Sequence, residues 1–375
     1  MRFMLVGGGS GGHFYPLIAT AEALRAREQE IDTSIQLYYI GPEVFDEPAL
    51  GNLGIEYVYC PAGKVRRYFS LKNISDAFRT FRGFFVALRK LFAIYPDAIF
   101  SKGSYTSVPV VLAAHILRIP IIVHESDVVP GRANKFGAKY ARYIGITYPE
   151  TAQYFPKERT ALIGSPLRRS FYAEPNQKVL KDFNLTPDDN FILFVTGSLG
   201  AERVNNFVLQ VLNELLPHYH IVHQTGKANI EVVNATADAL ITEPDLRARY
   251  HAFGLLPAAE IHALQSFASL VVSRAGSGTI SEIAFHQKPA ILIPIPEEVS
   301  HDQRTNAFTY ARTGGAVVME EHNLTENLLV AEINRIMQDS ELQAKMRRGA
   351  ESFFIHHAAF ALADTLISLS KEHAI

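Results

Sequence analysis

The stretch VGGGSGGHFYP (Val6–Pro16) indicates which structural motif begins the fold, because five glycines precede a histidine in it. The residues before it, RFMLV, have the pattern of a short buried strand, and PLIATAEALRAR at its end repeats apolar residues at helical spacing. The predicted order is therefore strand, glycine turn, helix. In that order the N–H groups of the turn and the positive end of the helix point to one spot, which suits an anion.

The same turn matches the spacing G-x-G-x-x-G of dinucleotide-binding folds at Gly7, Gly9 and Gly12. Such a site also needs an acidic residue about 20 residues further on, at the tip of the second strand, to bind a ribose. Here the predicted second strand, IQLYYIGP, ends in Ile-Gly-Pro, and Glu43 is a poor substitute for that acid. The turn therefore argues against a nicotinamide or flavin enzyme.

Length and composition limit the class of protein. A chain of 375 residues is long for one core and natural for two domains. Its formal net charge of −2 gives no overall attraction to nucleic acid, so no nucleic-acid partner is expected. The single cysteine, Cys60, excludes an intramolecular disulfide and fits a reducing compartment. No signal peptide is visible, and the most apolar stretch, SVPVVLAAHILRIPIIV, is interrupted by charge and proline, which predicts a soluble or peripheral cytoplasmic protein.

Strand-like apolar runs alternate with helical patterns along the whole chain, which predicts parallel sheets covered by helices on both faces. The polar stretch GSPLRRSFYAEPNQKVLKDFNLTPDDN separates two such series, and FILFVTGSLGAERVNNFVLQVL then repeats the order strand, glycine turn, helix. We therefore expect two α/β domains, residues 1–164 and 165–351, with a cleft lined by the carboxyl ends of both sheets.

A third glycine turn, in VVSRAGSGTISEIAF, is the most informative one. Gly276 and Gly278 form it, and Thr279 and Glu282 lie one helical turn apart on the same face. Hydroxyl and N–H groups at a helix start bind phosphate oxygens, and a carboxylate one turn later can accept two hydrogen bonds from a ribose diol. The turn therefore predicts a nucleotide site, with a capping box of Thr279 and Glu282 as the structural alternative.

Two further polar segments follow predicted strands. In HDQRTNAF, Gln303 and Asn306 share a helix face and suit sugar hydroxyls, unless they only begin a solvated helix. His124, Glu125 and Asp127 form a weak metal-binding pattern, and no metal is expected. The chain has neither G-x-S-x-G nor a P-loop motif, which argues against a serine hydrolase or an ATPase.

The segment KVRRYFSLKNISDAFRTFRGFFVALRKLF (64–92) carries a local charge of +7. Its apolar residues at helical spacing make one stripe, which consists of Phe78, Phe81, Phe85, Leu88 and Phe92. Basic residues beside such a stripe, Arg82 and Arg89 among them, suit a helix that lies on anionic lipid headgroups. The alternative is a crossover helix that covers the sheet. Phe84 lies off the stripe and is the residue expected to face outward.

With these motifs in order, the sequence resembles the MurG family of inverting GT-B glycosyltransferases, which add N-acetylglucosamine to the lipid-linked muramyl-peptide precursor of the bacterial cell wall. The resemblance rests on GGGSGGHFYP, KGSYTSVP, HESDVVPGRANK, GSPLR, TGSLGAERVN, HQTGK, SRAGSGTISE and HDQRTNA. It implies two Rossmann-like domains that face each other across a cleft, with a C-terminal helix of about residues 352–375 packed back on the first. It also implies a peripheral enzyme on the cytoplasmic face of the plasma membrane, without a cofactor.

The resemblance implies a donor site for UDP-N-acetylglucosamine, mainly on the second domain. Its positions are Ser10, Gly11, Gly12, Arg168, Ser198, Phe253, Arg274, Ser277, Gly278, Thr279, Glu282, Gln303 and Asn306. Among them, Arg168 and Arg274 lie near the diphosphate, Glu282 holds the ribose and Phe253 lies beside the uracil. Glycine N–H groups, helix N-termini and these arginines can stabilise a departing diphosphate without a metal.

The lipid-linked acceptor is implied on the first domain. The matching positions are Gly9, His13, Tyr105, Glu125, Ser126 and Asp127. A base must deprotonate the acceptor hydroxyl, and His13 is favoured because its ordinary pKa lies near neutral pH. Glu125 and Asp127 are the reserve candidates. The acceptor's own diphosphate is expected on the N–H groups of Gly9 to Gly12.

Two departures from the family pattern keep other functions open. In the acceptor loop, the family commonly has Glu-Gln-Asn where this chain has Glu125-Ser126-Asp127. Ahead of the last asparagine, the family commonly has His-Gln or Gln-Gln where this chain has His301-Asp302-Gln303. The alternatives are a transferase with another lipid acceptor such as diacylglycerol, a UDP-sugar epimerase, and a nucleotide-sugar-binding protein without catalysis. Only a transferase releases UDP when an acceptor is present, and an epimerase turns over the donor alone.

Overall fold

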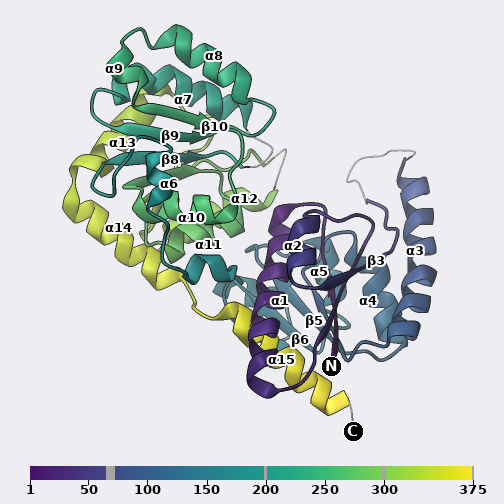
Figure 1. The fold of residues 1–375 in the computed structure, drawn as a ribbon. Coiled ribbons are helices and arrows are strands. Elements are labelled where there is room, and N and C mark those ends of the chain that lie inside the picture. The colour runs from purple at the N-terminus through teal and green to yellow at the C-terminus, as the bar shows by residue number, and fades with distance from the viewer. Residues whose placement is uncertain (65–71, 198–200, 298–300, 374–375) are drawn as a thin grey trace. The chain divides into compact units, whose positions relative to one another are not determined.

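The computed structural model describes residues 1–64, 72–197, 201–297 and 301–373. The chain divides into two compact units (Figure 1). Unit 1 consists of Met1–Arg169 and Ile355–Ile375, and unit 2 of Ser170–Phe354. Each unit is built around its own parallel sheet, so each is described by itself.

Unit 1 contains a seven-stranded sheet in the order β3-β2-β1-β4-β5-β6-β7, with parallel pairing throughout. Its strands are β1 (Arg2–Val6), β2 (Gln36–Gly41), β3 (Ile55–Tyr59), β4 (Ala98–Ser101), β5 (Ile121–Glu125), β6 (Tyr143–Ile146) and β7 (Thr160–Leu162). The order reverses between β1 and β4. Open α/β sheets bind ligands beyond the strand ends at such a reversal.

Helices cover both faces of this sheet. They are α1 (Gly11–Ile31), α2 (Glu47–Asn52), α3 (Lys72–Ile94), α4 (Ser107–Ile116), α5 (Arg132–Gly137) and α15 (Ala358–His373), with short 3-10 helices η1 (Pro149–Tyr154) and η2 (Lys157–Arg159). One core lies between the sheet, α1 and α15, and includes Leu17 and Leu366. The other lies under α3 and α4, and includes Leu91 and Val110. Figure 1 shows α15 alongside α1, whereas α3 packs next to α4.

Unit 2 contains a six-stranded parallel sheet in the order β10-β9-β8-β11-β12-β13. Its strands are β8 (Phe191–Val195), β9 (His220–Gln224), β10 (Tyr250–Phe253), β11 (Leu270–Ser273), β12 (Ala290–Leu292) and β13 (Ala316–Val318). Its helices are η3 (Arg169–Tyr172), α6 (Lys178–Lys181), α7 (Glu202–Leu215), α8 (Ile230–Leu240), α9 (Pro244–Arg247), α10 (Ala258–Phe267), α11 (Ser277–Phe285), α12 (His301–Ala311), α13 (Glu326–Gln338) and α14 (Ser340–Phe353). Here the order reverses between β8 and β11, next to the turn that precedes α11.

The predicted class, two α/β units with parallel sheets, is confirmed. By length and composition alone, the stretch Ser340–Glu372 would also pass as a membrane-spanning helix. The structure divides that stretch into α14 and α15, and their apolar residues, such as Ala350 and Leu362, lie in the cores of the two units. The apolar composition of this stretch is therefore explained by packing.

Candidate active site

In unit 1 the chain brings three segments together at the carboxyl edge of the sheet. Val6 pairs with Ser101, and Ser101 pairs with Val123, so β1, β4 and β5 end side by side. The glycine turn follows β1, Lys102 follows β4, and the acceptor loop, residues 125–127, begins where β5 ends. The strand register thus gathers residues that lie more than one hundred positions apart in the sequence.

His13 lies in the first turn of α1. The Oγ of Ser10 and the Nδ1 of His13 are 2.9 Å apart, so Ser10, which was expected at the donor, contacts the candidate base. The pKa of His13 is lowered to about 4, first because the protein removes the ring from water and second because of the charge of Lys102. The ring is therefore neutral at pH 7. When Nδ1–H donates to Ser10, Nε2 keeps a lone pair that can accept a proton.

Glu125 is only 2% exposed, and its carboxylate holds the acceptor loop. One oxygen accepts from the backbone N of Asp127 at 2.9 Å. The other accepts from the backbone N of Gly131 at 3.0 Å and from Nδ2 of Asn134 at 2.9 Å. These hydrogen bonds occupy lone pairs of the carboxylate that a proton acceptor would need. This geometry favours His13 over Glu125 as the base.

His124, the first member of the weak metal pattern, is fully buried, and its Nε2 donates to the carbonyl oxygen of Gly164 at 2.8 Å. Because Glu125 forms hydrogen bonds within the acceptor loop, the side chains of His124 and Glu125 bond to different groups. Within the described residues, no three His, Cys, Asp or Glu side chains are grouped in a way that could hold a metal ion.

Tyr105 and Arg168 border the glycine turn. A Cβ on Gly9 would lie 3.4 Å from the Tyr105 ring, so this tyrosine lines the glycine turn. The guanidinium of Arg168 stacks over the ring of Tyr15, 4.3 Å from its centre, and that ring lies 3.2 Å from the position of a Cβ on Gly11. In unit 1, Arg168 is therefore held on the helix that follows the turn.

In unit 2 the turn between β11 and α11 leaves open space. A Cβ placed on Gly276 or Gly278 would meet no atom within 4 Å. The helix begins at Ser277 with Gly276 as its N-cap, and no side chain caps it. Thr279 is the third residue of the helix, so the capping-box alternative is wrong. The N–H groups at the start of α11 are left for a ligand or solvent.

Glu282 lies one turn into α11 and is half-buried. Its Oε2 accepts from Nε2 of Gln265 at 3.4 Å, and Gln265 is fully buried on α10. The sequence reasoning missed Gln265, because a glutamine in an ordinary amphipathic helix carries no signal. The structure shows that it contacts the carboxylate that is expected to bind the ribose.

The other expected donor positions of unit 2 lie around the same sheet edge, whereas Ser10, Gly11, Gly12 and Arg168 belong to unit 1. Phe253 ends β10 with its ring buried against Phe183, at 5.8 Å between ring centres. On α12, Gln303 accepts from the backbone N of Ile295 at 3.2 Å, and Asn306 is fully buried. Ser198 lies outside the described residues.

Arg274 is part of a buried ion pair. Its Nη1 lies 2.5 Å from a carboxylate oxygen of Glu321, and it donates to the carbonyl oxygens of Ile293 at 3.2 Å and Pro294 at 3.3 Å. Glu321 also pairs with Arg203 at 3.4 Å. The charge of Arg274 is thus already balanced by the protein. Glu321 was missed because one acid after a short edge strand is unremarkable in a sequence.

The four phenylalanines of the α3 stripe face outward, whereas Leu88 is half-buried against the core that contains Leu91. Phe78, Phe81, Phe85 and Phe92 are 69%, 60%, 53% and 70% exposed, and Arg82 and Arg89 are exposed beside them. The expectation that Phe84 faces outward is wrong. Phe84 is half-buried against the core that contains Leu91, because this side of α3 covers the sheet. The helix is thus a crossover helix with an uncovered aromatic face.

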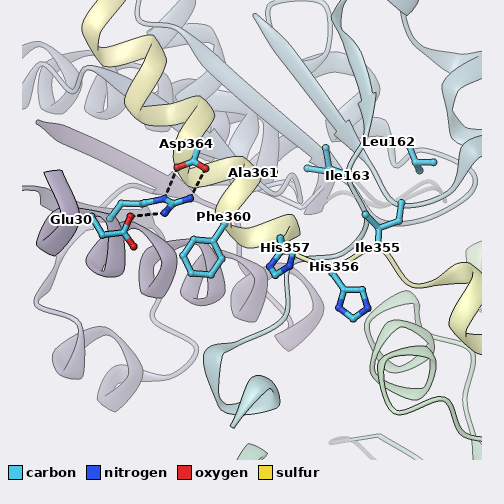
Figure 2. Close-up of a pocket in the computed structure, with 10 residues that line it drawn as sticks. Glu30, Leu162, Ile163, Ile355, His356, His357, Phe360, Ala361 and Asp364 are labelled. Atoms are coloured by element: carbon cyan, nitrogen blue, oxygen red, sulfur yellow. Dashed lines mark hydrogen bonds and ion pairs between the residues drawn. The ribbon is translucent and has the colours of Figure 1, made fainter.

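A cavity of about 570 Å³ in unit 1 lies apart from these residues. It is lined by Arg27, Glu30, Leu162, Ile163, Ile355, His356, His357, Phe360, Ala361 and Asp364 (Figure 2). Arg27 pairs with Asp364 at 2.7 and 2.9 Å and with Glu30 at 2.6 Å. The pair with Asp364 ties α15 to α1, whereas the pair with Glu30 lies within α1. None of the expected site residues lines the cavity.

The chain matches the family model of the glycosyltransferase family 28 N-terminal domain over residues 3–146 and that of the C-terminal domain over residues 191–360. A UDP-N-acetylglucosamine--N-acetylmuramyl-(pentapeptide) pyrophosphoryl-undecaprenol N-acetylglucosamine transferase of Lachnospira eligens is 37% identical over 340 residues, which cover 90% of this chain and 91% of that protein. A Bacillus cereus protein of the same name, with the number 2, is 36% identical over 91% of this chain and 93% of its own length.

Solved structures share the fold. The crystal structure of Acinetobacter baumannii MurG has a TM-score of 0.72 at 22% identity and covers 98% of this chain and 99% of its own. A putative UDP-N-acetylglucosamine 2-epimerase from Listeria monocytogenes has a TM-score of 0.71 at 14% identity and covers 100% of this chain and 96% of its own. The expected GT-B fold is confirmed, and one fold serves proteins with different reactions.

Proposed function

The chain belongs to the MurG family within glycosyltransferase family 28, and we propose that it transfers N-acetylglucosamine from UDP-N-acetylglucosamine to N-acetylmuramyl-(pentapeptide) pyrophosphoryl-undecaprenol in peptidoglycan synthesis. The observation that carries this proposal is 37% identity to a transferase of that name over nine-tenths of both chains. The shared fold is weaker support, since an epimerase has it as well. The reaction makes the lipid-linked disaccharide precursor of the cell wall and needs no cofactor.

Unit 2 supplies the donor site in this proposal. The open turn at Gly276 and Gly278 leaves room for a diphosphate at the N-terminus of α11, whose N–H groups and dipole stabilise negative charge. Glu282, oriented by Gln265, accepts hydrogen bonds from the ribose hydroxyls. Gln303 and Asn306, together with Ser277 and Thr279, complete the positions assigned to the donor, with the sugar next to α12.

Unit 1 supplies the acceptor site and the base. Nε2 of His13 takes the proton from the acceptor hydroxyl while that oxygen attacks the anomeric carbon of the donor sugar. The bond from the anomeric carbon to UDP breaks, UDP leaves with the electron pair, and the configuration inverts. The lowered pKa supports this role, because a neutral imidazole is required at the start of the step. Tyr105 and the acceptor loop orient the acceptor.

We further propose that unit 1 binds the cytoplasmic face of the plasma membrane through α3. The acceptor is lipid-linked, so the enzyme must reach a membrane surface. The exposed aromatic stripe and the adjacent Arg82 and Arg89 have the chemistry of a helix on anionic lipid. Replacing Phe81 and Phe85 with serine is expected to abolish sedimentation with anionic vesicles. In the matched control, serine replaces Val232 and Leu240 on α8, which are also exposed, and sedimentation persists.

The experiment that tests the transfer is a UDP-release assay with three arms. The purified enzyme is given UDP-N-acetylglucosamine with the lipid-linked muramyl-pentapeptide, with diacylglycerol, or with no acceptor. We expect release of UDP and formation of a lipid-linked disaccharide in the first arm alone. Release with diacylglycerol indicates the other lipid acceptor, conversion of the donor without acceptor indicates an epimerase, and binding without release indicates a non-catalytic protein.

A further inference from the structure

Lys102, directly after β4, is only 1% exposed and is among the largest fully buried side chains of the described residues. A buried ammonium loses its hydration, which is costly unless charged and hydrogen-bonding partners replace the water. The partners of Lys102 therefore indicate why a charge is retained at this position.

Lys102 connects the glycine turn with the acceptor loop. Its Nζ donates to Oγ of Ser126 at 2.7 Å. Its backbone N donates to the carbonyl oxygen of Val6 at 2.8 Å. A Cβ on Gly7 would lie 2.9 Å from the Cβ of Lys102, so the lysine packs directly behind the turn. One side chain thus spans from the end of β1 to the loop that follows β5.

Two carboxylates and two imidazoles interact electrostatically with this ammonium. Burial lowers the pKa of Lys102, and the charges of Glu125 and Asp127 act in the opposite direction. The pKa values of His13 and His124 are lowered to about 4 and about 3, first by removal from water and second by the charge of Lys102. Lys102 is therefore the cation that the acidic loop and both rings share.

We propose that Lys102 is a positioning residue for the sugar acceptor, because its ammonium offsets the negative charge of Glu125 and Asp127 and fixes Ser126 between them. The inference rests on the proposed function and deepens its acceptor side. Lys102 acts through these neighbours and not by contact with the substrate, since its side chain has almost no exposed surface. The same charge gives a physical reason for a carboxylate at Asp127, where the family pattern has an amide.

Three variants test this proposal. Lys102→Met keeps most of the length of the side chain and removes its charge. Asp127→Asn removes one negative charge from the loop, and the third variant combines both changes. In Lys102→Met we expect the acceptor KM to rise at least about tenfold at an unchanged donor KM, and the His13 ring to titrate at higher pH in NMR spectra. In the double variant, both the acceptor KM and the His13 titration midpoint return most of the way to their values in the unmodified enzyme, because charges that compensate each other are coupled.

Ser126→Ala is the matched control. It removes the hydrogen bond at 2.7 Å and leaves the charge, so the acceptor KM rises while the titration midpoint of His13 stays constant. If Lys102→Met does not fold, Asp127→Asn is compared with the double variant, in which the midpoint must be higher.

The proposal is contradicted if the loss of Lys102 leaves the His13 midpoint unchanged, or if Asp127→Asn restores neither property. The titration needs no substrate and therefore tests the inference independently of the transfer reaction. An unmodified enzyme that transfers no sugar refutes the proposed function alone.

Discussion

The glycine turns of the two units differ in what surrounds them. In unit 1, a Cβ on Gly7 would lie 2.9 Å from Lys102 and 3.1 Å from the backbone oxygen of His13. In unit 2, a Cβ on Gly276 or Gly278 would meet nothing within 4 Å. The first turn is crowded by protein atoms at Gly7 and Gly8, although Gly12 has open space, and the second turn is open at both glycines.

This difference separates two roles that one motif can have. A crowded turn brings protein groups close together, here a candidate base and a buried cation. An open turn at a helix N-terminus exposes N–H groups that suit a diphosphate. We therefore assign the uridine diphosphate to unit 2 and the proton transfer to unit 1, and the variants below test that assignment.

The largest effect is expected for His13→Ala on the crowded side. Loss of a general base lowers turnover about 10²- to 10⁴-fold, and the donor Kd changes little because the diphosphate is bound by the other unit. Turnover is measured by UDP release and the Kd by calorimetry. The control His218→Ala replaces an exposed histidine of unit 2 and keeps full activity. Unchanged turnover in His13→Ala would exclude it as the base.

Glu282→Gln on the open side should show the opposite pattern. Hydrogen bonds to a charged group contribute about 1.5–3 kcal/mol, so the donor Kd rises about tenfold to a hundredfold. The unfolding midpoint stays constant, because the amide fills the same volume. Glu231→Gln, at an exposed position of α8, is the control without effect. A donor Kd that does not change in Glu282→Gln contradicts the ribose assignment.

A pair of alanine substitutions tests the packing difference itself. Gly7→Ala forces a methyl group against Lys102 and lowers the free energy of unfolding by about 1–3 kcal/mol. In Gly278→Ala the new methyl group meets no atom, and the free energy of unfolding rises by up to about 1 kcal/mol because alanine is the better helix former. The donor Kd of this variant increases. Urea denaturation measures both variants. Equal destabilisation of the two would contradict the comparison.

The smallest effect concerns pH. A base must be deprotonated to act, and the pKa of His13 is lowered to about 4 by removal from water and by Lys102. The neutral fraction therefore stays near one down to pH 5.5, and kcat/KM for the acceptor is expected to change less than about twofold between pH 7.5 and 5.5. An acid limb near the ordinary histidine value of about 6.5 would show that the ring is not shielded in this way.

Much of the fold could be predicted from the sequence, because central strands such as FILFV (Phe191–Val195) are buried on both faces and read as unbroken apolar runs. The edge strands β7, β10 and β13 are harder to predict, since each has only three or four residues and is partly exposed. Phe84 was misjudged for a related reason. Helical spacing shows which residues share a face, but only the neighbouring sheet decides which face is covered.

Most candidate site positions were predicted from the glycine turns and the polar residues that flank them. The residues that the sequence did not reveal are Lys102, Gln265 and Glu321, which act through burial and through partners distant in the chain. A lysine in SKGS looks like a surface residue, since lysine is almost never fully buried unless paired. Its partner Ser126 lies on a different strand end, and no local pattern joins the two.

Hydrogen exchange of the full chain with and without UDP tests the division between the two turns most directly. UDP lacks the sugar, so it reports on the nucleotide diphosphate alone. The account predicts slower exchange at the start of α11, residues 276–282, and unchanged exchange in the turn of residues 7–12. Protection of residues 7–12 by UDP, with none at 276–282, would contradict it.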